Sequence, residues 1–264
     1  MGLSALGGVL LFYWAPMKIA VQLYTLRNLL QNDTYTTLRR LTDIGFKTAE
    51  LAGTYGKPPE EFATKCREFG LKIISPHLGI DQFEQHPDDV KKLCDTMGTD
   101  MAVLPHVGKD VYGDGWDKAA KRFNKIGAAM KDRGIRFFYH NHSFEFEKIG
   151  DTTGYDILWD NADPALVWCE MDLYWVKYGG GDPVHYLKKL KGRVKNTHFK
   201  DMAATEDRRF EDVGYGILDW KTIIPTAISE GVDYAIIEQD DPPGDPLEHV
   251  ARSRDYLISQ GLSD

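Results

Sequence analysis

The chain has 264 residues, of which 27% are charged and 42% are hydrophobic, as in an ordinary globular protein. Its formal net charge of −8 at pH 7 argues against nonspecific binding to nucleic acid, which needs a basic surface. The three cysteines, Cys66, Cys94 and Cys169, have neither the number nor the spacing of a disulfide framework or a zinc knuckle. A reducing, cytoplasmic setting is therefore expected.

The first sixteen residues, MGLSALGGVLLFYWAP, are largely apolar and contain no Lys or Arg. A secretory signal peptide needs a positively charged start, and a membrane-spanning helix needs about 20 apolar residues. Neither condition is met. We therefore expect residues 1–16 to be a disordered extension, residues 17–264 to form the folded domain, and no membrane to be a partner.

From residue 18 onward, short apolar runs alternate with longer stretches of helical periodicity. Strands are predicted at 18–24, 48–51, 71–77, 101–106, 135–142, 166–172, 194–199 and 234–240. Helices are predicted at 35–44, 58–69, 87–97, 116–133, 155–159, 183–190, 220–229 and 246–257. Four of these helices are followed by a glycine that is expected to act as a C-cap, namely Gly45, Gly70, Gly98 and Gly134. This alternation is typical of βαβ units in the α/β class.

Two α/β architectures produce such an alternation. A doubly wound open sheet that binds a dinucleotide normally carries a GxGxxG turn after its first strand, and this sequence has none there. Eight consecutive units instead favour closure into one (β/α)8 TIM barrel, whose active site lies at the C-terminal ends of the strands.

Chemically useful side chains gather at the predicted C-terminal ends of the strands. They are Glu50, His77, His106, His140, His142, Glu145, Asp172, His198, Lys200, Asp201, Glu238 and Asp240. Any one of them alone is most simply a helix cap, a turn residue or a hydrogen-bonded structural residue. In a closed barrel they would all face one mouth, where buried carboxylates are costly without a cation.

One divalent metal ion is the cation that this set of side chains favours. Glu145, Asp172, His198 and Glu238 belong to the fifth to eighth predicted strands and are the expected ligands. They are separated by 27, 26 and 40 residues, close to the roughly 30 residues of one βα unit. Their mostly oxygen donors favour Mn²⁺, with Mg²⁺, Co²⁺ or Zn²⁺ as alternatives.

Six motifs carry a resemblance to a known family. They are VQLYTLR, YHNHSFEF, EMDLYW, THFKD, VGYGILDW and IIEQD, and together they span most of residues 18–241. The pattern resembles the xylose isomerase-like TIM barrels, the sugar phosphate isomerase/epimerase superfamily. The resemblance implies one metal ion held by Glu, Asp, His and Glu at the ends of strands five to eight, which agrees with the ligands named above. Members of this superfamily often form dimers or tetramers, so the resemblance leaves a homo-oligomer open.

The resemblance implies a metal-dependent isomerase or epimerase of a small sugar or sugar derivative. The metal would polarise a carbonyl, and a base would remove the proton from the adjacent carbon. His142 is the first candidate base, Glu145 and Glu238 would carry protons at the metal, and Lys200 would stabilise negative charge on oxygen. The residues expected to bind the substrate are His77, His106, Tyr24 and Trp175.

Other functions remain to be distinguished. A lyase or dehydratase acting on a keto-inositol or a 3-keto-glycoside would use the same proton abstraction, and the motif HNHxxEF resembles that branch more than the ketose 3-epimerases. A DNA-repair enzyme like endonuclease IV would need several zinc ions and a basic face, which eight histidines and a charge of −8 argue against. A non-enzymatic binding barrel would fail to bind the metal.

Overall fold

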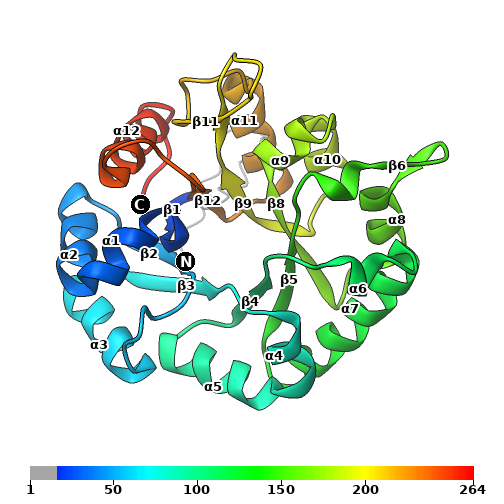
Figure 1. Ribbon diagram of the computed structural model, residues 1–264, viewed down its shortest axis with the longest axis horizontal. Coiled ribbons are helices and arrows are strands. Elements are labelled where there is room, and N and C mark those ends of the chain that lie inside the picture. Colours follow the sequence, from blue (N-terminus) through cyan, green and yellow to red (C-terminus); the bar gives the residue numbers. More distant parts are fainter. Residues whose placement is uncertain (1–16) are drawn as a thin grey trace, which may run out of the picture.

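Eight parallel strands form a ring with helices packed around its outside (Figure 1). The computed structural model describes residues 17–264, so the prediction for residues 1–16 lies outside the described residues. The strands of the ring are β1 (Lys18–Gln22), β2 (Thr48–Leu51), β3 (Lys72–Pro76), β4 (Met101–Leu104), β5 (Arg136–His140), β8 (Val167–Asp172), β9 (Val194–Phe199) and β12 (Tyr234–Ile237). Their order in the sheet is β3-β2-β1-β12-β9-β8-β5-β4, which confirms the predicted TIM barrel.

The ring closes between β3 and β4, and this pair of strands has fewer backbone contacts than the other neighbouring pairs. Every other pair of neighbouring strands is joined by at least two residue pairs in parallel register. At the β3–β4 joint, a single bridge pairs His77 with Val103, and the amide of Leu78 donates to the Val103 carbonyl at 2.9 Å. The barrel therefore has one weakly bonded seam.

Twelve α-helices surround the strands within residues 17–264. They are α1 (Arg27–Asn32), α2 (Thr34–Ile44), α3 (Pro59–Phe69), α4 (Ile80–Gln85), α5 (Pro87–Met97), α6 (Lys109–Tyr112), α7 (Trp116–Lys131), α8 (Gly154–Asn161), α9 (Leu173–Tyr178), α10 (Pro183–Lys189), α11 (Trp220–Glu230) and α12 (Pro246–Ser259). Eight of them correspond to the predicted helices, and the short α1, α4, α6 and α9 are additions within the loops. Gly45 caps α2 with a φ of 117° and Gly70 caps α3 with a φ of 76°, as predicted.

Several strands are shorter than predicted, which places site residues on loops. The first strand stops early, so Tyr24 lies on a 3-10 turn, η1 (Leu23–Leu26). β5 and β12 also end early, so His142, Glu238 and Asp240 lie on the segments that leave the rim. Two small hairpins decorate the same rim, β6–β7 (Lys148–Ile149 with Thr152–Thr153) and β10–β11 (Asp201–Met202 with Phe210–Glu211).

The interior of the ring changes from apolar to polar along the barrel axis. Because side chains alternate along a strand, residues two apart face the same side. Toward the N-terminal ends of the strands, the interior is a small apolar core of Ala20, Ile74, Met101, Val103, Phe138 and Ile236. Above it lie buried polar side chains, namely Gln22, Glu50, Ser75, His140, Glu170, Asn196 and His198. The apolar lower layer packs the strands together, and the polar layer leads to the C-terminal mouth.

Candidate active site

A buried group of Asp172, His198 and Glu238 lies at the C-terminal mouth of the barrel. One ligand atom from each lies within 4.8 Å of the others, so the group could hold a metal ion. His198 Nδ1 is 2.7 Å from Glu238 Oε2 and 4.0 Å from Asp172 Oδ2. Three of the four predicted ligands are thus brought together, on the ends of β8, β9 and β12.

The two carboxylate oxygens of Asp172 make different contacts. Its Oδ1 accepts a hydrogen bond of 2.9 Å from the Trp175 amide and so caps the N-terminus of α9. Its Oδ2 is buried and has no hydrogen-bond partner, although the Lys200 ammonium lies 3.0 Å away. The cap fixes the side chain, and the second oxygen is left facing the site.

Lys200 is fully buried among carboxylates. Its Nζ is 3.0 Å from Asp172, 2.7 Å from Glu238 and 2.8 Å from Asp240. Burial alone would lower the pKa of Lys200, but the three carboxylates hold the pKa well above its ordinary value. The ammonium is therefore charged and firmly positioned.

Beneath this group lies a second set of interacting side chains, which we call the deep tetrad: Glu50, His77, Glu170 and His198. His198 Nε2 is 2.7 Å from Glu50 and 3.2 Å from Glu170. His77 Nε2 is 3.0 Å from Glu50 and 2.9 Å from Glu170. The two imidazole rings are nearly parallel, with centroids 5.6 Å apart. His198 therefore faces carboxylates on both sides.

His140 lies between the two groups. Its Nδ1 is 3.4 Å from Glu170, and its Nε2 is 3.7 Å from Asp172. The ring centroid is 4.4 Å from that of His198. Burial, together with the neighbouring His198, holds the pKa of His140 well below its ordinary value, so its ring is neutral. A neutral buried imidazole beside two carboxylates is suited to bind a metal ion.

Glu145, the fourth predicted ligand, is not part of either group that could hold a metal. Both of its carboxylate oxygens accept from the His142 amide at 3.0 Å, and the Tyr139 hydroxyl donates to it at 2.7 Å. Because β5 ends at His140, the chain turns back through η2 (Phe144–Phe146), and Glu145 holds this turn. Burial raises the pKa of Glu145 to about 7.

A cavity of about 390 Å³ opens above these side chains. Its walls are formed by Tyr24, Ala52, His77, Pro105, His106, His140, His142, Lys200, Glu238 and Asp240. Three of the four predicted substrate-binding residues line it, and Trp175 lies behind His142 with ring centroids 5.6 Å apart. Burial, with the charge of Lys200, lowers the pKa of His142 to about 3, so its imidazole is neutral.

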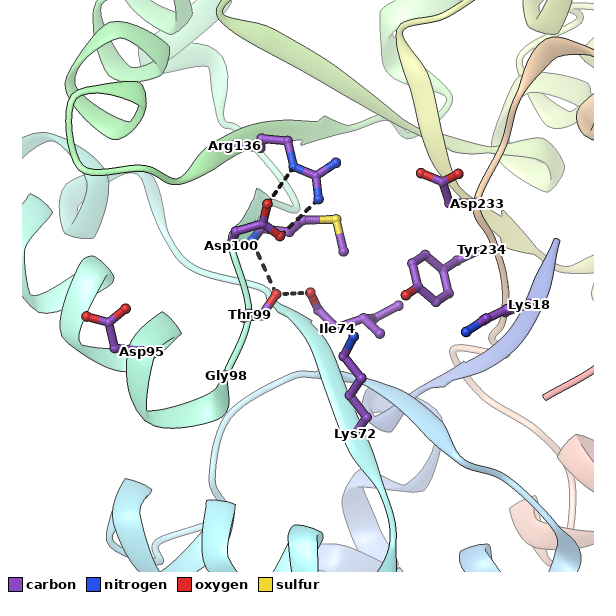
Figure 2. A pocket seen from close by; sticks show the side chains of 11 residues that line it. Lys18, Lys72, Ile74, Asp95, Gly98, Thr99, Asp100, Arg136, Asp233 and Tyr234 are labelled. Atoms are coloured by element: carbon purple, nitrogen blue, oxygen red, sulfur yellow. Dashed lines mark hydrogen bonds and ion pairs between the residues drawn. The ribbon is translucent and has the colours of Figure 1, made fainter. Parts of the chain in front are cut away.

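A larger cavity of about 580 Å³ lies at the opposite, N-terminal end of the barrel (Figure 2). Lys18, Lys72 and Tyr234 point into it, while Arg136 and Asp100 pair with each other through two hydrogen bonds. Neither of the groups that could hold a metal lies there. The smaller cavity at the C-terminal mouth is therefore the candidate active site.

Two buried residues of this region, Glu170 and Asn196, are not among the predicted site residues. Glu170 lies two residues before Asp172, so it faces the same side of β8 at a deeper level. Asn196 has the same relation to His198 on β9, and its amide donates to Glu170 at 3.2 Å. The two-residue periodicity of a strand is the signal that predicts both.

Within residues 17–264, no helix has the length and hydropathy needed to cross a bilayer.

The fold and this site define a class of protein: a TIM barrel whose C-terminal mouth holds a buried carboxylate–histidine group suited to a divalent ion. The chain belongs to the xylose isomerase-like TIM barrel family, whose model matches residues 38–260.

The chain is similar to several named proteins. An inosose dehydratase of Clostridium perfringens is 27% identical over 254 residues, covering 81% of this chain and 85% of that protein. An inosose dehydratase of Lacticaseibacillus casei is 24% identical over 258 residues, covering 82% and 86%. The crystal structure of a sugar phosphate isomerase/epimerase from Parabacteroides distasonis matches with a TM-score of 0.77 at 25% identity, covering 94% of this chain and 96% of that one.

Proposed function

We propose that the protein is a divalent-metal-dependent lyase that removes water from a small keto-polyol or keto-sugar. The observation that carries the proposal is the buried group of Asp172, His198 and Glu238 at the floor of the cavity, beside the charged Lys200. The similarity to inosose dehydratases supports the reaction class, which sequence analysis considered as the alternative to an isomerase or epimerase.

The charges of the buried residues support the metal. Glu50, Glu170, Asp172, Glu238 and Asp240 supply five carboxylates. Lys200 and, if both are protonated, His77 and His198 supply at most three positive charges. Burial, only partly offset by Lys200, raises the pKa of Asp172 to about 6, as expected for a carboxylate without enough countercharge. A divalent ion would supply the two missing charges.

The ligands that we propose are Asp172, His198, Glu238 and His140. The first three come from the sequence prediction, and His140 takes the place of Glu145 because Glu145 is bound to its own turn. Two contacts support this choice: the buried Oδ2 of Asp172 accepts no hydrogen bond and pairs with the Lys200 ammonium, and His140 Nε2 lies 3.7 Å from that oxygen. Two carboxylates with two imidazoles suit Mn²⁺, Co²⁺ or Zn²⁺, and we propose Mn²⁺ as the first ion to test.

The side chains around the cavity can perform an elimination. The metal, when bound, would act as a Lewis acid on the substrate carbonyl. His142, which is neutral, would accept the proton from the carbon next to that carbonyl. Lys200 would stabilise the negative charge that develops on the substrate oxygen. The protonated His142 would then give its proton to the hydroxyl on the next carbon, whose C–O bond breaks as the C=C bond forms. One water leaves, and His142 is neutral again.

The charges of the side chains that line the cavity favour an uncharged substrate. Lys200 is the one lysine or arginine among the described residues that line it, and its ammonium already contacts three carboxylates. A phosphate group would find no free cation there and would meet Glu238 and Asp240 instead. This favours a neutral keto-polyol over a sugar phosphate.

An isomerase or epimerase is the second candidate, favoured by the similarity to the sugar phosphate isomerase/epimerase structure. It would begin with the same proton transfer to His142. It would differ in the next step, because the proton would return to carbon and no C–O bond would break.

The test is to incubate the purified protein and Mn²⁺ with an inosose and with 3-keto-sugars, and to analyse products by mass spectrometry and NMR. A product lighter by one water, with new alkene signals, would support the lyase. A product of unchanged mass that takes up deuterium from D₂O would support the isomerase or epimerase instead. Asp172→Asn is the matched inactive control, and a wild-type protein that binds no divalent ion would refute both.

A further inference from the structure

His198 is held at both of its ring nitrogens by buried carboxylates. Its Nδ1 faces Glu238 and Asp172, where we propose the metal, and its Nε2 faces Glu50 at 2.7 Å and Glu170 at 3.2 Å. The ring is completely buried, so solvent cannot satisfy either nitrogen. The protein therefore has to determine which nitrogen carries a proton.

Glu50 is itself tightly fixed. The Ser75 hydroxyl donates to its Oε1 at 2.5 Å, and the Gln22 amide donates to its Oε2 at 2.9 Å. These partners lie on β3 and β1, the two strands that flank β2. Glu50 is thus a buried carboxylate in a fixed orientation.

Glu170 is fixed in the same way from the other side of the tetrad. The Asn196 amide donates to its Oε2 at 3.2 Å, and His77 Nε2 lies 2.9 Å from its Oε1. Glu170 is completely buried, as Glu50 is. His77 bridges the two carboxylates and provides the positive charge that keeps them close together.

We propose that Glu50, assisted by Glu170, is a positioning residue that prepares His198 to bind the metal. An ionised carboxylate only accepts hydrogen bonds, so it requires a proton on His198 Nε2. In the neutral ring, the lone pair then lies on Nδ1, which faces Asp172 and Glu238. Carboxylates that orient metal-binding histidines in this way typically change metal affinity by 10- to 100-fold. The inference rests on the proposed metal site and extends it to residues that do not touch the ion.

The alternative is a second metal ion in an overlapping group that contains His140 in place of Glu50. His77, His140, Glu170 and His198 have ligand atoms within 4.8 Å of one another. However, His198 would then have to bind one ion through each nitrogen. The short contacts of both rings with both carboxylates are explained by hydrogen bonds alone, so we favour positioning. The stoichiometry of metal binding separates the two.

The experiment is Glu50→Gln, measured by Mn²⁺ titration calorimetry and by elemental analysis. Glutamine keeps the size of the side chain, loses the charge and offers an amide that can donate to Nε2, which would favour the wrong tautomer. We expect one Mn²⁺ per wild-type chain and a 10- to 100-fold weaker affinity in Glu50→Gln. At saturating Mn²⁺, kcat should recover most of its wild-type value, because Glu50 does not touch the substrate.

Two further variants guard against a purely structural effect. Ser75→Ala removes only one anchor of Glu50 and should weaken Mn²⁺ binding in the same direction by a smaller factor. Leu38→Ala, in the core of α2 and away from the site, lowers stability without touching His198 and should leave Mn²⁺ affinity unchanged. Equal loss of affinity in Leu38→Ala and Glu50→Gln would overturn the proposal.

The outcomes separate this inference from the proposed function. If wild type binds one Mn²⁺ that Asp172→Asn abolishes, but Glu50→Gln binds it equally well, the positioning role is wrong and the metal site stands. If wild type binds two ions, the group of His77, His140, Glu170 and His198 is a second metal site and the positioning role is wrong. If wild type binds none, the proposed function itself fails.

Discussion

Replacing Glu145 by glutamine separates two roles for the buried carboxylate that follows β5. If Glu145 only holds the turn, as its contacts with His142 and Tyr139 indicate, it is a destabilising charge at neutral pH. Burial raises its pKa from 4.5 to about 7. This change corresponds to about 3 kcal/mol of folding free energy, since each tenfold change in proton affinity is about 1.4 kcal/mol.

The sign of the pH dependence follows from this raised pKa. Below about pH 4.5, Glu145 is protonated in both the folded and the unfolded chain. Between about pH 4.5 and 7 the unfolded chain ionises while the folded chain keeps its proton, so stability falls as pH rises. Above pH 7 the full penalty is present. Glutamine cannot ionise, so the variant should escape this loss while still accepting the hydrogen bond from the His142 amide.

The assay is urea unfolding of the metal-free wild type and of Glu145→Gln at several pH values from about 4.5 to 8.5. The stability of the variant relative to wild type should rise across this range by up to about 3 kcal/mol. Glu248→Gln, on an exposed position of α12, is the control and should show no such rise. A relative stability of Glu145→Gln that does not change with pH would refute the reasoning. Loss of Mn²⁺ binding in Glu145→Gln would show instead that Glu145 is a ligand, as the sequence predicted.

Three other outcomes are expected. His142→Gln should keep its affinity for Mn²⁺, measured by calorimetry, while turnover falls by about 100- to 10,000-fold, the usual contribution of a positioned base; loss of the ion would make His142 a ligand. Mn²⁺ at 100 times its Kd should raise the free energy of unfolding of the wild type by about 2.7 kcal/mol. Asp172→Asn should show no such rise. A wild-type melting temperature that no divalent ion changes would exclude the site. Deleting residues 1–16 should leave melting temperature and turnover unchanged, whereas a large drop would show that this segment contributes to the barrel.

The fold could be predicted from sequence because each βα unit carries its own signals. Apolar runs, helical periodicity and capping glycines such as Gly45 and Gly70 are local, and eight repetitions of them leave few alternatives to a closed barrel. The ends of the strands were less predictable. Tyr24, for example, continues an apolar run, but the chain already bends there to pass over the rim.

The candidate site was predictable where chain order determines position. Asp172 and His198 end neighbouring parallel strands, so their proximity follows from the topology. Glu145 could not be placed in this way, because it lies beyond the end of β5 on a turn whose path depends on its own hydrogen bonds. The contact of Glu50 with His198 joins β2 to β9, which are not neighbouring strands, and no local pattern in the sequence encodes such a contact.

The single bridge between β3 and β4 gives the barrel wall unequal stiffness around its circumference. The proposed ligands come from β5, β8, β9 and β12, neighbouring strands that are each joined by four residue pairs in parallel register. His77 and His106 follow the two strands at the seam, which one bridge and one backbone hydrogen bond join. We therefore expect the proposed ligands to keep a constant geometry while the side of the barrel at the seam adjusts to the ligand. If the proposed function holds, the protein should accept several related ketones that differ in size or stereochemistry.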